Sequence, residues 1–143
     1  MTSATGPAVV GGGVAALDTL FARCRAEGRA ALVGYLPAGF PTVPAAVEAL
    51  RAMVEAGVDV VEVGIPYSDP LLEGPVIAAA HETALAGGTR TADVLDTVRA
   101  VAETGAPTLV MGYWNPVHRY GFRRWAADPV SYTHLTLPTK RIV

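Results

Sequence analysis

One stretch of this chain, positions 58–75, constrains the fold more than any other; it reads VDVVEVGIPYSDPLLEGP. Its first half is a near-continuous apolar run rich in β-branched residues, which is typical of a strand buried in a parallel sheet. Glu62 lies inside that run, where its carboxylate loses water and must either be paired or raise its pKa. Because side chains alternate along a strand, Glu62 lies on the opposite face from Val61 and Val63. If helices cover the Val face, Glu62 points into whatever the sheet encloses.

Helix-like and strand-like segments alternate on both sides of this stretch. Apolar residues at helical spacing, with a capping residue such as Thr42 and a stop residue such as Gly57, predict the helices. We expect helices over 14–27, 43–56, 75–86, 91–104 and 117–127, and strands over 31–36, 58–65 and 108–113. Asn115 and Pro116 are expected to turn the chain before the last helix. This alternation predicts the α/β class, with parallel strands joined by right-handed crossovers.

Two terminal segments are predicted to lie outside the main α/β domain, which we assign to 14–128. Positions 1–13 are small, polar and Gly-rich, so we expect them to be disordered. Positions 129–143 are assigned to a non-native tail, because VSYTHLTLPTKRIV is Thr-rich and does not continue the preceding helix. We expect 130–143 to be foreign sequence that contributes nothing to the fold; the alternative is a genuine β-rich tail.

Charge and composition exclude several classes of protein. The net charge is −2 and 17% of residues are charged, without the clustered Lys and Arg of a nucleic-acid-binding surface. No apolar run reaches the ~18 residues of a membrane helix. The single cysteine, Cys24, excludes an internal disulfide, suits the cytosol and is expected in the core of the first helix. His81, His118 and His134 share no metal-ligand spacing, so we expect no metal site.

Three motifs occur in order along the chain: GYLPAGFP at 34–41, VEVGIPYSDPLLEGP at 61–75 and MGYWNP at 111–116. Together they resemble the alpha chain of tryptophan synthase. The resemblance implies the N-terminal half of a (β/α)8 TIM barrel with an N-terminal helix. It implies a cytoplasmic carbon–carbon lyase of tryptophan biosynthesis, which cleaves indole-3-glycerol phosphate to indole and glyceraldehyde 3-phosphate by a retro-aldol step. It also implies no cofactor in this chain and an α2β2 complex with a beta chain that holds pyridoxal phosphate.

The resemblance also carries roles to individual residues. Glu62 falls on the family's acid/base glutamate. Glu73 falls on the second catalytic carboxylate, which is normally an aspartate that holds the indole N–H; here it is one methylene longer. The positions of the substrate pocket are Tyr35, Met111 and Tyr113. The positions of the interface with the beta chain are Pro66, Asp69, Pro70 and Asn115.

The chemistry of the implied reaction explains the need for two carboxylates. A desolvated glutamate with a raised pKa both gives and takes protons near neutral pH. A second carboxylate that stays ionised favours positive charge on the ring nitrogen.

Other functions stay open at this point. The family's phosphate-binding loops and lid belong to later strands, so we expect this chain alone to be inactive. The chain could instead be a non-catalytic fragment or a remnant that docks on the beta chain. Another phosphate-binding barrel enzyme is the remaining alternative.

Overall fold

The computed structural model describes residues 14–127 and 133–135. Its helices are α1 (Val14–Ala26), α2 (Val43–Glu55), α3 (Pro75–Ala86), α4 (Thr91–Ala102), α5 (Trp114–Tyr120) and α6 (Phe122–Ala127). Its strands are β1 (Val33–Pro37), β2 (Val60–Gly64), β3 (Thr108–Met111) and β4 (Thr133–Leu135). Residues 1–13, for which we expect disorder, lie outside the described residues.

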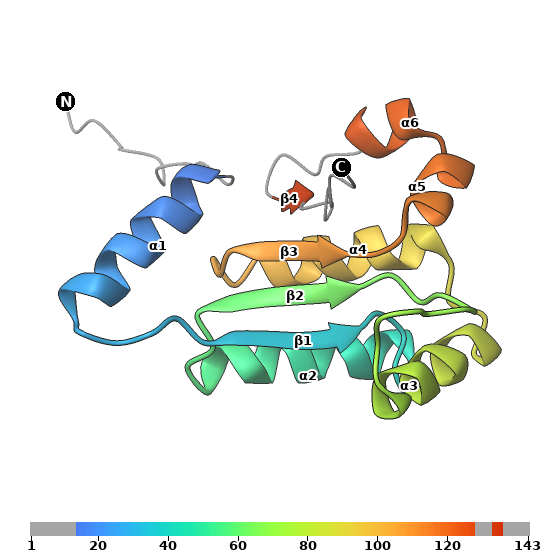
Figure 1. Ribbon diagram of the computed structural model, residues 1–143, viewed down its shortest axis with the longest axis horizontal. Helices are drawn as coiled ribbons and strands as arrows, with labels where there is room; N and C mark the ends of the chain where they lie inside the picture. Colours follow the sequence, from blue (N-terminus) through green and yellow to red (C-terminus); the bar gives the residue numbers. More distant parts are fainter. Residues whose placement is uncertain (1–13, 128–132, 136–143) are drawn as a thin grey trace, which may run out of the picture.

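The strands form one sheet in the order β1-β2-β3-β4, and every neighbouring pair is parallel. Figure 1 shows α2 and α4 lying along one face of this sheet, with the strands of β1 to β3 pointing the same way. The predicted α/β class and the parallel strands are therefore confirmed. Each strand is shorter than predicted: β1 begins two residues later and ends one later, β2 is shorter at both ends, and β3 ends two residues earlier.

The apolar face of β2 is the centre of the main core. Val61, Val63 and Ile65 are buried and pack in one cluster with residues of α2 and α4. The helices offer apolar side chains at helical spacing, as expected. The buried helix residues of this cluster are Leu50, Val94, Leu95, Val98 and Val101. Fully burying one such side chain stabilises the fold by about 1.5–3 kcal/mol, so this face fixes which side of the strand Glu62 occupies.

Helix α1 packs at the other face, at the amino ends of the strands (Figure 1). Its Leu20 and Cys24 form a second small cluster with Val60 of β2. Cys24 is buried there, which confirms the prediction that it is a core residue on the first helix. Val60 and Glu62 share a face, so α1 covers the amino end of the Glu62 face and leaves its carboxyl end to the loops.

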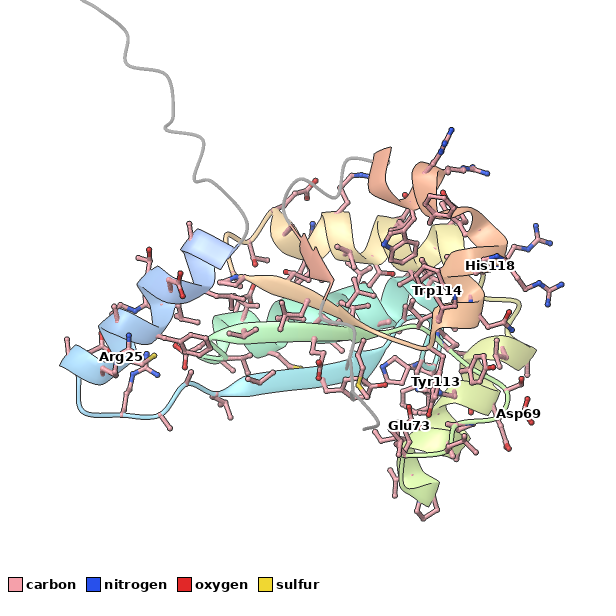
Figure 2. The ribbon with its side chains drawn as sticks, turned by 45° about the horizontal axis from the view of Figure 1, so that its top comes forward. Arg25, Asp69, Glu73, Tyr113, Trp114 and His118 are labelled. Atoms are coloured by element: carbon pink, nitrogen blue, oxygen red, sulfur yellow. The ribbon has the colours of Figure 1, made fainter. Side chains whose placement is uncertain are left out.

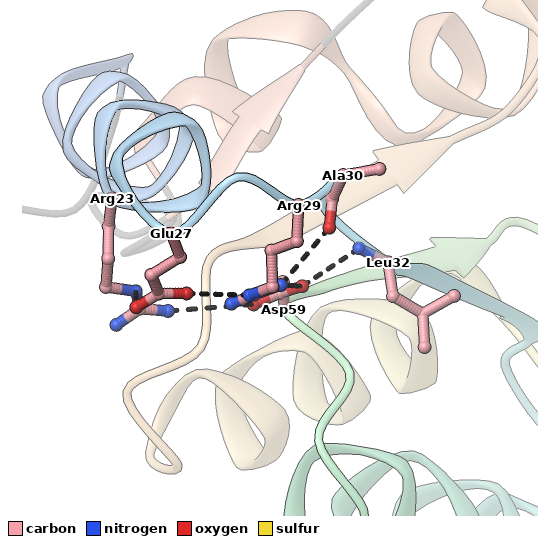
Figure 3. A network of polar contacts seen from close by, with 6 residues as sticks. All are labelled: Arg23, Glu27, Arg29, Ala30, Leu32 and Asp59. Atoms are coloured by element: carbon pink, nitrogen blue, oxygen red, sulfur yellow. Dashed lines mark hydrogen bonds and ion pairs between the residues drawn. The ribbon is translucent and has the colours of Figure 1, made fainter.

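A polar network fastens the end of α1 to the sheet (Figure 3). Asp59, just before β2, accepts two hydrogen bonds from the Arg29 guanidinium at 2.6 and 2.8 Å, and a third from the Leu32 N–H at 2.9 Å. Arg23 of α1 lies 3.6 Å from the same carboxylate, and Arg29 also pairs with Glu27 at 2.6 Å. The network therefore ties helix, connecting loop and strand together at one buried acid.

Two expectations near the carboxyl end are corrected by the structure. The single helix expected over 117–127 is two helices, α5 and α6, divided at Gly121, whose φ of +96° is a conformation that favours glycine. Helix α5 begins at Trp114, so Asn115 and Pro116 lie in its first turn instead of forming a turn before it. Proline is tolerated there, because the first N–H groups of a helix have no partner within it.

The segment 130–143 was expected to take no part in the fold, and the structure differs for three of its residues. Thr133–Leu135 form β4, which pairs in parallel with β3. The rest of that segment lies outside the described residues, and its foreign origin stays a prediction. Among the described residues, no helix is long and apolar enough to cross a membrane.

Candidate functional site

Glu62 and Tyr35 lie side by side on the face of the sheet that α2 and α4 leave open. The β1–β2 register pairs Tyr35 directly with Glu62, so both side chains leave the sheet on the same side. Both are half-buried. Two parallel strands thus bring a carboxylate and a phenol together, as the predicted pocket requires.

The next level of the same face, towards the carboxyl ends of the strands, contains a glycine and a methionine. Gly64 lies two residues after Glu62 and pairs with Met111 of β3. A Cβ at Gly64 would collide with the hydroxyl of Tyr35, so the tyrosine ring crosses the space that the glycine leaves. The structure therefore brings Met111 to the same face as Tyr35 and Glu62.

Tyr113 is placed differently from its prediction. Strand β3 ends at Met111, so Tyr113 is the residue that precedes α5 and is not part of the strand. Its hydroxyl donates to Glu73 Oε2 at 2.7 Å and accepts from the N–H of Leu71 at 2.9 Å. Its ring stacks on Tyr67, with ring centroids 4.5 Å apart. Tyr113 therefore holds the loop between β2 and α3 at both of its ends, and Figure 2 shows it beside Glu73.

The two predicted catalytic carboxylates have opposite electrostatic surroundings. Burial raises the pKa of Glu62 above its ordinary value, and none of the described residues donates a hydrogen bond to it. Burial also raises the pKa of Glu73. The hydrogen bonds from Tyr113 and from backbone N–H groups outweigh that effect, and the pKa of Glu73 is lowered overall. Glu62 is thus suited to exchange protons and Glu73 to stay ionised.

Tyr35 responds electrostatically to both carboxylates. Burial raises the pKa of its phenol well above the usual range, and the negative charges of Glu73 and Glu62 raise it further. Its hydroxyl therefore remains protonated and acts as a hydrogen-bonding group only.

The structure adds a residue to the site that the sequence analysis considered only as a metal ligand. His81 of α3 is fully buried, and its Nε2 lies 3.1 Å from the Tyr35 hydroxyl. Its other nitrogen, Nδ1, accepts from the N–H of Tyr67 at 3.3 Å. The sequence contained a signal for its burial, because His81 lies with Ala80 and Ala84 on the apolar face of the helix, and all three are buried.

The residues predicted for the partner interface lie at the carboxyl ends of the strands, near the two carboxylates, but they differ in exposure. Asp69 and Asn115 are exposed, Pro70 is half-buried and Pro66 is buried. Pro66 and Asn115 line one cavity of about 550 Å³, together with Arg90, Arg119 and Arg124. Asp69 and Pro70 lie outside that lining, so the structure brings together two of the four residues in this cavity.

A larger cavity, of about 780 Å³, lies at the opposite end of the sheet, between α1 and the amino ends of the strands. It is lined by Arg23, Arg29 and Asp59 of the polar network and contains none of the predicted site residues. Within the part of the chain that the structure describes, no group of three or more His, Cys, Asp or Glu side chains is placed to hold a metal ion.

Solved structures with the same arrangement of strands and helices come from tryptophan synthases. Tryptophan synthase from Mycobacterium tuberculosis in its aminoacrylate-bound form matches with a TM-score of 0.80 and 47% identity, over 87% of this chain and 54% of that chain. The alpha subunit from Legionella pneumophila matches with a TM-score of 0.76 and 37% identity, over 85% of this chain and 48% of that chain. The described sheet is therefore part of a (β/α)8 barrel, as predicted.

Curated relatives and a family model agree with this assignment. The alpha chain of tryptophan synthase from Salinispora tropica is 60% identical over 112 residues, which are 78% of this chain and 42% of the relative. That from Mycobacterium bovis is 50% identical over 127 residues, which are 89% of this chain and 47% of the relative. The chain thus spans less than half the length of these relatives. The family model described as tryptophan synthase alpha chain matches residues 21–132, and the chain belongs to that family.

Proposed function

We propose that a full-length alpha chain carrying residues 14–127 of this sequence, called the full-length chain below, is a carbon–carbon lyase. Its substrate is indole-3-glycerol phosphate and its products are indole and glyceraldehyde 3-phosphate. The observation that carries the proposal is the desolvated Glu62 beside Tyr35, with a second carboxylate, Glu73, held ionised by the loop. Membership of the family supports the choice of substrate.

The proposed reaction needs only proton transfers. Protonated Glu62 gives its proton to C3 of the indole ring, and the ring nitrogen then carries positive charge that the Glu73 carboxylate stabilises. Glu62 next takes the proton of the side-chain hydroxyl, and the C–C bond breaks as the aldehyde forms. The bonding electrons return to the ring, which leaves as neutral indole, and Glu62 ends protonated as it began. No cofactor in this chain is required by these steps.

We propose a tryptophan synthase beta chain as the partner, in an α2β2 complex in which the beta chain holds pyridoxal phosphate. The exposed Asp69 and Asn115, at the carboxyl ends of the strands, support a partner surface at this end of the barrel. We also propose a cytoplasmic location, with which the free thiol of Cys24 is compatible.

Glu62→Gln in the full-length chain tests the proposed reaction. Glutamine keeps the size of the side chain but transfers no proton, so kcat for indole release should fall by about 10²–10⁴ with KM little changed. The matched control is Glu48→Gln, which changes an exposed glutamate of α2 and should leave both constants unaltered. Steady-state kinetics are run with and without the beta chain. Full turnover by Glu62→Gln would show that Glu62 is not the acid/base group.

A further inference from the structure

His81 is the most buried titratable side chain near the site, with 1% of its surface exposed. The proposed proton transfers do not use it. Its imidazole joins two segments far apart in the sequence: Nε2 meets the hydroxyl of Tyr35 on β1, and Nδ1 meets the N–H of Tyr67 in the loop after β2. Both nitrogens therefore have a hydrogen-bond partner.

The partner at Nδ1 determines which nitrogen carries the proton. A backbone N–H only donates, so Nδ1 must present a lone pair to Tyr67 and carry no hydrogen. The proton of the neutral ring is then on Nε2, which donates to the oxygen of Tyr35. A ring protonated on both nitrogens would set two N–H groups against each other at the 3.3 Å separation.

The tautomer of His81 in turn sets the polarity of the Tyr35 hydroxyl. Because the Tyr35 oxygen accepts from His81, its own hydrogen is left to donate elsewhere, on the face that also carries Glu62. The absence of a side chain at Gly64 allows the ring to take this position, since a Cβ there would collide with the Tyr35 hydroxyl. Burial and the nearby carboxylates keep the phenol protonated, as described above.

We propose that His81 is a positioning residue that orients the Tyr35 hydroxyl as a hydrogen-bond donor towards a ligand oxygen in the pocket. The chain of contacts runs from the Tyr67 N–H through the imidazole to Tyr35, so the loop that carries Glu73 also fixes the donor. The ligand oxygen belongs to an alcohol, such as the hydroxyl of a glyceryl side chain. This identification of the ligand rests on the proposed function; the hydrogen-bond chain itself does not.

Two substitutions separate the two bonds of His81. The amide oxygen of His81→Asn lies near the Nδ1 position, so it keeps the acceptor for Tyr67 and loses the donor to Tyr35. The longer His81→Gln brings its NH₂ group to the Nε2 position, so it keeps the donor to Tyr35. Tyr35→Phe removes the hydroxyl alone and keeps the ring. His118→Asn changes an exposed histidine of α5 and is the matched control.

The kinetic arm uses the full-length chain in complex with its beta chain. We expect His81→Asn and Tyr35→Phe each to raise KM roughly two- to tenfold, the effect of one lost hydrogen bond, with a smaller change in kcat. The double variant should be no worse than either single variant, because both remove the same donor. His81→Gln and His118→Asn should stay close to the unsubstituted protein. Additive effects in the double variant, or a His81→Gln as impaired as His81→Asn, would overturn the proposal.

The spectroscopic arm needs no activity and no variant that alters the fold. In ¹⁵N NMR spectra of the full-length chain, the His81 signals should report a neutral ring with the proton on Nε2; they are assigned by their loss in His81→Gln. A proton on Nδ1 would overturn the hydrogen-bond chain. If the unsubstituted full-length chain releases no indole, the proposed lyase function fails, whereas the tautomer measurement still decides the role of His81.

Discussion

At the scale of single residues, the two carboxylates of the site are held in opposite ways. Glu62 is fixed by the strand on which it lies, and burial raises its pKa. Glu73 lies on the loop between β2 and α3. Its carboxylate accepts hydrogen bonds from the Tyr113 hydroxyl at 2.7 Å and from the Leu72 N–H. The Glu73 side chain thus has a specific hydrogen-bond partner, the Tyr113 hydroxyl. Loss of that partner should change Glu73 without touching Glu62.

Tyr113→Phe tests this difference in the full-length chain. The substitution removes the donor to Glu73 and the acceptor for the Leu71 N–H, but keeps the ring that stacks on Tyr67. The pKa of Glu73 should rise, because the tyrosine hydrogen bond lowers it. Exchange of the Leu71 amide should become roughly two- to tenfold faster, as one hydrogen bond of about 0.5–1.5 kcal/mol is lost. Carboxyl ¹³C titration and hydrogen exchange measure the two effects.

Tyr67→Phe is the matched control, since it removes the hydroxyl of the other ring in the stacked pair. It should leave the pKa of Glu73 unchanged. Equal shifts in both variants would mean that general loosening of the loop, and not the hydrogen bond from Tyr113, controls Glu73.

Residue-scale prediction from the sequence succeeded where a local rule was sufficient. Strand alternation alone put Glu62 opposite the buried Val61 and Val63. The resemblance placed Tyr35 and Glu62 in one site, but their direct pairing was not predicted, because register depends on contacts between strands. The contact between Tyr35 and His81 joins residues 46 apart in sequence. The apolar stripe of its helix indicates that His81 is buried, but no local pattern encodes which residue it contacts.

At the scale of elements, α1 depends on the polar network around Asp59 as well as on its small apolar cluster. The Asp59 side chain is 5% exposed and accepts from Arg29 and from the Leu32 N–H. The hydrogen bonds from Arg29 and then Leu32 hold the pKa of Asp59 well below its usual range. A lowered folded-state pKa stabilises the fold above the ordinary aspartate pKa, and this stabilisation is lost as the pH falls through the folded value.

Asp59→Asn in the full-length chain should therefore weaken the packing of α1 at neutral pH. It should also reduce the fall in the free energy of unfolding as the pH becomes acidic. Urea unfolding midpoints measured from neutral pH down to strongly acidic pH check both effects. Asp96→Asn is the matched control, because Asp96 pairs with Arg99 on the exposed surface of α4, where an ion pair contributes little. An unchanged pH dependence in Asp59→Asn would show that the network does not stabilise the fold.

Element boundaries were predicted less well than element types. The start of α2 was correct because Thr42 caps it through the Ala45 N–H at 3.4 Å, which is a local interaction. The start of α5 was wrong because Asn115-Pro116 was interpreted as a turn, although a proline fits the first turn of a helix equally well. The choice between the two is made by the packing of Val117 into the core, which the sequence does not display.

At the scale of the whole molecule, the described sheet has β1 at one edge, and that edge is apolar. Val33 of β1 and the preceding Leu32 are 49% and 58% exposed. An exposed apolar edge strand is a template for pairing with another chain. We therefore expect the 143-residue chain, expressed alone, to self-associate and to lack a sharp cooperative melt.

Val33→Lys tests whether that association runs through the edge. A charge on the edge strand opposes pairing with a second sheet, so the substitution should reduce the self-association constant at least several-fold. Val76→Lys is the matched control, because Val76 is 79% exposed but lies on helix α3 and takes no part in the strand ladder. Light scattering behind size-exclusion chromatography, over a range of protein concentrations, measures both variants. A monomeric unsubstituted chain with a cooperative melt would contradict the prediction outright. If both lysines reduced self-association equally, the cause would be the loss of exposed apolar surface in general. Pairing along β1 predicts an effect of Val33→Lys alone.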